Sequence, residues 1–193
     1  VKFDFFPNGD ALIALRPGKL VRIDYKTNQL QDAGKVNTTF LSHIELGLVG
    51  VTIDPEFPAK PYIYTVYSVQ DAEGKLSQQL VRFNWKDNQI DPASEKMILQ
   101  HGVDNSCCHT GGDLQFGKNR ELFYSTGDNT NPHEQDGYNP IDFREDKPHN
   151  DALRGAGNTQ DLRGKVLRIR VSDDGSYTIP EGNLFKDAAQ GRP

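Results

Sequence analysis

The residues best suited to chemistry stand together near the middle of the chain, in the segment 105–113, Asn-Ser-Cys-Cys-His-Thr-Gly-Gly-Asp. A free imidazole titrates near neutral pH, so His109, at the entrance of an expected strand, is well suited to act as a general base. The pair Gly111 and Gly112 allows a ligand or a neighbouring strand to approach the backbone closely. The alternative is that His109 is a structural histidine, hydrogen-bonded at the start of the strand. The two glycines would then serve only tight packing between blades.

The two cysteines of the chain, Cys107 and Cys108, are adjacent in sequence and cannot join distant segments. A disulfide between them would close a strained eight-membered ring and stiffen a single turn. Its formation would indicate an oxidising compartment. Two reduced, buried thiols are the alternative reading.

An oxygen-rich stretch follows, with Asp128 and Asn129 at its start and Asp136 and Asp142 farther on. Loops of this composition can bind calcium, which takes six to eight oxygen ligands. We therefore treat Asp128 and Asn129 as candidate metal ligands. The spacing does not match the EF-hand loop, and Asp and Asn are common in turns that bind no metal.

Two other positions carry charges near expected strand ends. Glu45 precedes an apolar strand and is placed to accept hydrogen bonds from a substrate or to orient a base; an exposed loop acid is the alternative. Arg163 and Lys165 flank a glycine at a strand entrance. They predict either an anion site or ordinary solvated charges.

The elements that must position these residues are short strands. Apolar or alternating runs are separated by turn signals, which indicates an all-β fold. Only two short segments favour a helix, Asp91–Lys96 and Leu184–Ala189. The formal net charge of −5 is scattered, no basic run suggests nucleic acid, and no apolar run is long enough to span a membrane.

Internal repetition sharpens the fold prediction. A strand, a tight turn and a returning strand recur at Lys19–Tyr25, Gln79–Trp85 and Lys165–Val171, and a second repeated unit precedes each copy. Each unit thus has four strands, which is typical of a propeller blade. We expect three blades, at about 1–35, 47–100 and 109–180, with an insertion at about 127–161 inside the third.

Three blades are fewer than the four to eight with which propellers usually close. We therefore expect residues 1–193 to be a partial propeller domain from a larger protein. The chain also starts without Met in what reads as the middle of a strand, which we interpret as a processed boundary.

The motifs together resemble the soluble glucose/sorbosone (aldose sugar) dehydrogenase family, which uses pyrroloquinoline quinone (PQQ). The resemblance covers about residues 1–185, as the N-terminal half of a six-bladed propeller. It rests on segments that agree in order and spacing: 45–57, 61–64, 80–83, 109–117, 122–128 and 162–169.

The resemblance implies oxidation of an aldose to its lactone, with His109 as the base and hydride transfer to the quinone. Glu45 would lie on the substrate side, and Gly111 and Gly112 would be close to the site. Cys107 and Cys108 would shape the wall near the cofactor. Cys108 stands where some relatives carry an aspartate beside the base, so the resemblance does not extend to tuning of the base by a carboxylate at that position.

The main ligands of PQQ and calcium are expected beyond residue 193, so the fragment alone should be inactive. The partners implied are a sugar and an electron acceptor such as a cytochrome or a quinone, in a periplasmic or secreted protein. The alternative is a carbohydrate- or protein-binding propeller without redox activity. A lactone-hydrolysing propeller is a weaker option, because its ring of channel ligands is not evident.

Overall fold

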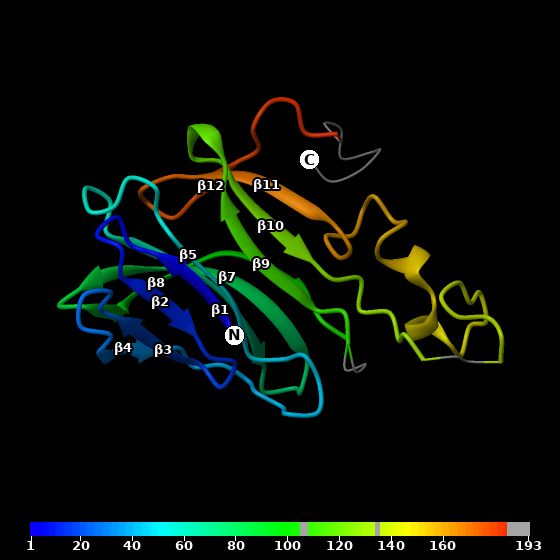
Figure 1. The fold of residues 1–193 in the computed structure, drawn as a ribbon. Helices are drawn as coiled ribbons and strands as arrows, with labels where there is room; N and C mark the ends of the chain where they lie inside the picture. Colours follow the sequence, from blue (N-terminus) through cyan, green and yellow to red (C-terminus); the bar gives the residue numbers. More distant parts are fainter. Residues whose placement is uncertain (105–107, 134–135, 185–193) are drawn as a thin grey trace.

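The strands form three antiparallel sheets that follow one another along the chain in the computed structural model, which describes residues 1–104, 108–133 and 136–184 (Figure 1). The first sheet contains β1 (Lys2–Phe5), β2 (Ala11–Ala14), β3 (Lys19–Ile23) and β4 (Leu30–Lys35). The second contains β5 (Leu48–Ile53), β6 (Tyr62–Gln70), β7 (Leu76–Lys86) and β8 (Gln89–Gly102). The third contains β9 (Gly111–Phe116), β10 (Leu122–Thr126), β11 (Val166–Val171) and β12 (Tyr177–Thr178). Each sheet is a meander in which spatial order equals sequence order, as in a propeller blade.

The short helix candidate at Asp91–Lys96 does not form, because these residues lie inside β8, with Asp91 and Lys96 paired to Asn84 and Arg82 of β7. Asp87 and Asn88 have φ values of 52° and 64°, the geometry of a two-residue hairpin turn that returns the chain antiparallel to β7. Most of Leu184–Ala189 lies outside the described residues. The helices in the described part are three 3₁₀ turns, Lys118–Arg120 (η1), Pro148–Asn150 (η2) and Ala152–Arg154 (η3).

The first strands of the three sheets, β1, β5 and β9, lie side by side at the centre of the molecule (Figure 1). Two glycines set how closely β5 and β9 approach. A Cβ atom on Gly50 would lie 2.1 Å from the carbonyl oxygen of Gly112, a distance that no real side chain can occupy. The close approach therefore requires glycine at position 50.

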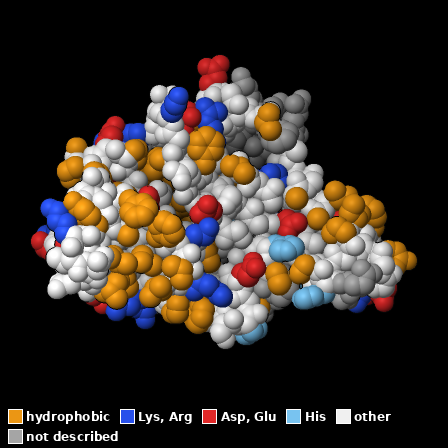
Figure 2. All heavy atoms as spheres, viewed as in Figure 1, with side chains coloured by type: hydrophobic (Ala, Val, Ile, Leu, Met, Phe, Trp, Pro, Cys, Tyr) orange, Lys and Arg blue, Asp and Glu red, His pale blue; other side chains and the backbone are white. Residues whose placement is uncertain are grey.

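The sheets pack face to face through two apolar cores that share the middle sheet. Ile63 of β6 belongs to the core between the first and second sheets, and its neighbour Tyr64 belongs to the core between the second and third. Side chains alternate across a strand, so both faces of β6 are buried. The outer sheets differ: Phe3 and Phe5 on β1 and Val166 on β11 are 61%, 60% and 70% exposed. Figure 2 shows hydrophobic side chains gathered over the first sheet.

Each sheet carries an arginine at the same place of its third strand, and each one fastens a turn. Arg22 binds the buried carboxylate of Asp10, and Arg168 binds Glu121. Arg82 instead reaches into the next sheet and donates to the carbonyls of residues 172 and 173, at 3.0 and 2.9 Å. The repeated arginine thus stabilises two blades internally and joins the second blade to the third.

A buried ion pair forms a second link between the second and third sheets. The Asp54 side chain is fully buried and accepts hydrogen bonds from Arg120 Nη2 at 2.6 Å and from the Tyr64 hydroxyl at 3.1 Å. Arg120 is in η1 and has a left-handed backbone, with φ of 57°. A carboxylate inside protein loses its hydration, and the attraction of a cationic partner offsets this loss.

Replacing Arg120 by Met should therefore destabilise the protein by about 3–5 kcal/mol, because Asp54 is left buried without its cation. Unfolding in urea, followed by circular dichroism, measures the change. The matched control is Lys19→Met, which removes the cation of the exposed Lys19–Asp32 pair and should change little. Equal unfolding midpoints for the Arg120 variant and the wild type would contradict the assignment.

Candidate active site

The loop before β9 and the residues after β10 meet at a tight corner that contains His109. His109 lies two residues before β9, with φ of 61° and a side chain 46% exposed. Gly127 follows β10 directly, and its N–H donates to the carbonyl of Thr110 at 3.0 Å. A Cβ atom on Gly127 would lie 1.7 Å from the carbonyl oxygen of His109. The corner can form only with glycine at position 127.

The corner brings a carboxylate to the histidine. Asp128 Oδ1 lies 3.3 Å from His109 Nδ1, and the Asp128 side chain is 20% exposed. The N–H of Thr130 donates to the same oxygen at 3.0 Å, which fixes the carboxylate. A carboxylate at Nδ1 favours the tautomer with the proton on that nitrogen and leaves Nε2 as the proton acceptor. Position 108 carries Cys, and the carboxylate beside His109 comes instead from Asp128, at the end of another strand.

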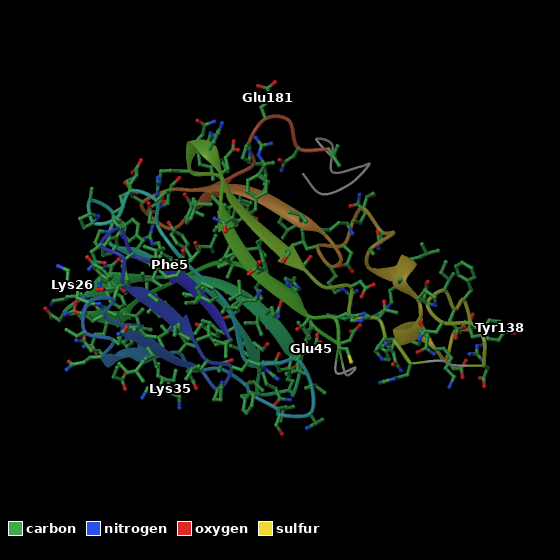
Figure 3. The ribbon with its side chains drawn as sticks, viewed as in Figure 1. Phe5, Lys26, Lys35, Glu45, Tyr138 and Glu181 are labelled. Atoms are coloured by element: carbon green, nitrogen blue, oxygen red, sulfur yellow. The ribbon has the colours of Figure 1, made fainter. Side chains whose placement is uncertain are left out.

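Glu45 is held against the same segment by two hydrogen bonds. Its Oε2 accepts from the Thr110 N–H at 3.2 Å, and its carbonyl accepts from Thr110 Oγ1 at 2.8 Å. Arg16 braces the Glu45 loop from the first sheet, with Nη2 donating to the carbonyls of Leu41 and Leu46 at 3.3 and 3.1 Å. Figure 3 shows Glu45 beside the start of β9.

A cavity of about 360 Å³ opens beside this loop. Residues from all three sheets and from the Glu45 loop line it: Val1, Lys2, Arg16, Glu45, Leu48, Val49, Thr110, Gly111, Gly112, Asp113 and Ser125. Gly111 and Gly112 have φ of 70° and 125°, and a Cβ on Gly112 would lie 2.3 Å from Val49. The two glycines therefore give a wall of bare backbone next to His109.

The predicted cysteine positions are only partly described. Cys108 directly precedes His109 and is half-buried. Cys107 lies outside the described residues, so the pairing of the two cysteines stays a prediction.

The predicted metal ligands make other contacts. Asn129 is fully buried; its Nδ2 donates to the His109 carbonyl and its Oδ1 accepts from the Asp104 N–H. Asp136 and Asp142 both bind Arg144, and the hydrogen bonds that Arg144 donates to Asp142 lower the pKa of Asp142 to about 2. Within the described ranges no group of three His, Cys, Asp or Glu side chains is placed to hold a metal. Metal binding at Asp128 and Asn129 stays a prediction.

The two cations predicted at a strand entrance bind groups of the protein itself. Arg163 donates to Asp161 and, at 2.9 Å, to Asp104. Lys165 Nζ donates to the carbonyls of residues 155, 156 and 163 at 2.8, 3.1 and 2.9 Å. The contacts of Arg163 and Lys165 therefore do not support an anion site. Asp104 was not found by sequence reasoning, because its partners Arg154 and Arg163 are at least 50 residues away in the chain.

The insertion predicted at about 127–161 is the connection between β10 and β11, and its described part has a defined structure. The Arg144–Asp142 pair and the contact of Arg144 with the Tyr138 ring, at 4.4 Å, organise its outer portion. Tyr138 is 52% exposed and lies at the far end of the insertion (Figure 3). The insertion thus extends outward from the corner that contains Asp128.

A second histidine, His101, is buried near the end of β8 with 7% exposure. Its Nδ1 lies 3.1 Å from the carbonyl of Gly102, and its Nε2 lies 2.8 Å from the Tyr124 hydroxyl. Because a carbonyl can only accept, Nδ1 carries the proton. Burial lowers the pKa of His101 below its ordinary value of 6.5.

His101 should therefore make stability depend on pH. The unfolded chain takes up a proton more readily than the folded one, so the unfolding free energy should fall as pH drops below about 6.5. His101→Gln should flatten this dependence between about pH 7 and pH 5 in urea titrations. His133→Gln, at an exposed position, should not. Identical pH slopes for wild type and His101→Gln would contradict the inference.

Three meandering sheets whose first strands lie side by side define a β-propeller, with three blades in the described part of the chain. Residues 1–193 match the model of the Glucose / Sorbosone dehydrogenase family, and the chain belongs to that family. The family prediction from the sequence motifs is confirmed.

Individual relatives agree with this placement. Quinoprotein glucose dehydrogenase B of Acinetobacter calcoaceticus is 27% identical over 183 residues, which are 86% of this chain and 34% of that protein. The crystal structure of a Thermus thermophilus oxidoreductase described as a glucose dehydrogenase matches with a TM-score of 0.70 and 26% identity, over 98% of this chain and 48% of that one. The PQQ-bound aldose sugar dehydrogenase of Streptomyces coelicolor shares the fold, with a TM-score of 0.67 and 22% identity. The match covers 95% of this chain and 47% of that one.

The chain spans less than half the length of each of these relatives. No helix in the described part of the chain has the length and hydropathy needed to cross a membrane.

Proposed function

We propose that residues 1–193 carry the base of a PQQ-dependent sugar dehydrogenase that oxidises an aldose to its lactone. The observation that carries this proposal is the His109–Asp128 pair, which adjoins Thr110, a residue that lines the cavity together with Glu45. A histidine with a carboxylate on one nitrogen and an open second nitrogen is the arrangement that general-base catalysis requires.

His109 Nε2 would accept the proton of the sugar C1 hydroxyl while hydride leaves C1. Asp128 would stabilise the imidazolium that forms and keep the ring in place. Glu45 would accept a hydrogen bond from a sugar hydroxyl through the oxygen that Thr110 does not occupy. Loss of the proton and the hydride from the C1–OH group leaves the C=O bond of the lactone.

PQQ, when bound, would supply the hydride acceptor. One feature of this structure fits the group: backbone without side chains forms the wall at Gly111 and Gly112. Residues 110–112 would form the wall of its site. We infer that the other PQQ ligands, and those of a calcium ion, lie beyond residue 193. A sugar and an electron acceptor such as a cytochrome or a quinone would be the partners, in the periplasm or outside the cell.

The test uses the natural protein that contains residues 1–193, supplied with PQQ and calcium, and follows aldose oxidation with a dye as acceptor. His109→Ala should lower kcat by about 10²-fold or more, because general-base catalysis is lost. Asp128→Asn should lower kcat less, and the control His133→Ala should not change it. Normal turnover by His109→Ala would reject the assignment. Sugar binding without oxidation would favour a binding propeller instead.

A further inference from the structure

The backbone of His109 is in the left-handed region, with φ of 61°. Residues other than glycine are uncommon there, although histidine enters the region more often than most. The residue persists there only because surrounding contacts determine it. The direction of the imidazole toward Asp128 depends on this backbone conformation, because φ sets where the Cβ atom points.

The contacts that fix this conformation come from Asn129. Its main-chain N–H and its side-chain Nδ2 both donate to the carbonyl oxygen of His109, at 3.0 and 2.9 Å. Two donors from different directions leave that peptide group little freedom to rotate. Asn129 has a φ of 58°, which asparagine tolerates, and its side chain is fully buried.

The other end of the Asn129 amide is fixed as well. Its Oδ1 accepts from the N–H of Asp104 at 3.0 Å, so donor and acceptor ends each face a suitable group. The Asp104 carboxylate binds Arg163 at 2.9 Å and also contacts Arg154. Asn129 therefore connects the carbonyl of His109 to an anchored point just after β8.

We propose that Asn129 is a positioning residue for the base: it holds the His109 carbonyl and thereby directs the imidazole toward Asp128. This inference rests on the proposed function, since it assigns Asn129 a part in the same site. Asn129 does not contact substrate in this role. It acts through His109 alone.

The variants separate the side chain of Asn129 from its backbone. Asn129→Gly keeps the left-handed backbone and the main-chain N–H but removes the Nδ2 donor. Asn129→Asp keeps the shape and the Oδ1 acceptor and also removes the donor. The control is Asn150→Ala. Asn150 is another buried asparagine of the insertion, and its side chain hydrogen bonds to Asp142.

Two readouts are needed, and both use the natural protein that contains residues 1–193. The first is the ¹⁵N chemical shifts of the His109 ring, which report its tautomer and its contact with Asp128. The second is kcat and KM with an aldose, PQQ and calcium. Both Asn129 variants should shift the ring signals and lower kcat about tenfold or more while KM changes little, because a displaced base costs rate rather than binding.

Unchanged ring signals in both Asn129 variants would overturn the proposal, as would an equal shift in the Asn150→Ala control. Failure of the proposed function has a different signature. In that case the wild type does not oxidise aldoses, or His109→Ala remains active, while the ring signals of the Asn129 variants still decide whether Asn129 positions His109.

Discussion

The site depends on one contact between two stretches of backbone. Gly127 lies so close to the His109 carbonyl that no side chain fits between them. This contact brings the end of β10 against the loop before β9, and Asp128 and Asn129 reach His109 as a consequence. Any larger residue at position 127 would separate His109 from the Asp128 carboxylate and from the Asn129 amide that holds its carbonyl. The electrostatic contact between His109 and Asp128 thus depends on a steric constraint, the absence of a side chain at position 127.

Much of the fold could be predicted from the sequence because each element has a local signal. Tight turns such as Asp87-Asn88 separate the strands, and the repeated arginine marks the third strand of each blade. Burial also follows the pattern of the strands. The run Tyr62–Gln70 is apolar on both faces and belongs to the middle sheet, whereas β1 alternates and lies in an outer sheet. The blade arrangement was therefore readable before any contact was known.

The helix candidate at Asp91–Lys96, which does not form, shows where local signals fail. This polar segment has residues that tolerate a helix, but its pairing with β7 across the hairpin determines its conformation. The paired residues at the two ends of the segment, Asp91 and Lys96, hold it extended and outweigh a weak local propensity. Segments with few apolar residues are the least determined by sequence alone.

The site was predictable in its parts but not in its connections. His109, Glu45 and the glycine pair were found from residue type and position. The partnership of His109 with Asp128 joins residues 19 positions apart, and that of Asp104 with Arg163 joins residues 59 apart. Nothing in the local pattern encodes such contacts. Asn129 could be noticed as polar, but only its buried position shows that it binds backbone.

The insertion leaves the blade immediately after Asp128 and Asn129, and its described outer part is organised by its own Arg144–Asp142 pair. The residues that touch His109 thus belong to the blade end rather than to the protruding portion. The outer portion is also joined to the rest of the insertion, where the N–H of Ala152 donates to the carbonyl of Pro140 at 2.9 Å. A change confined to the outer portion would therefore leave the contacts of His109 with Asp128 and Asn129 in place.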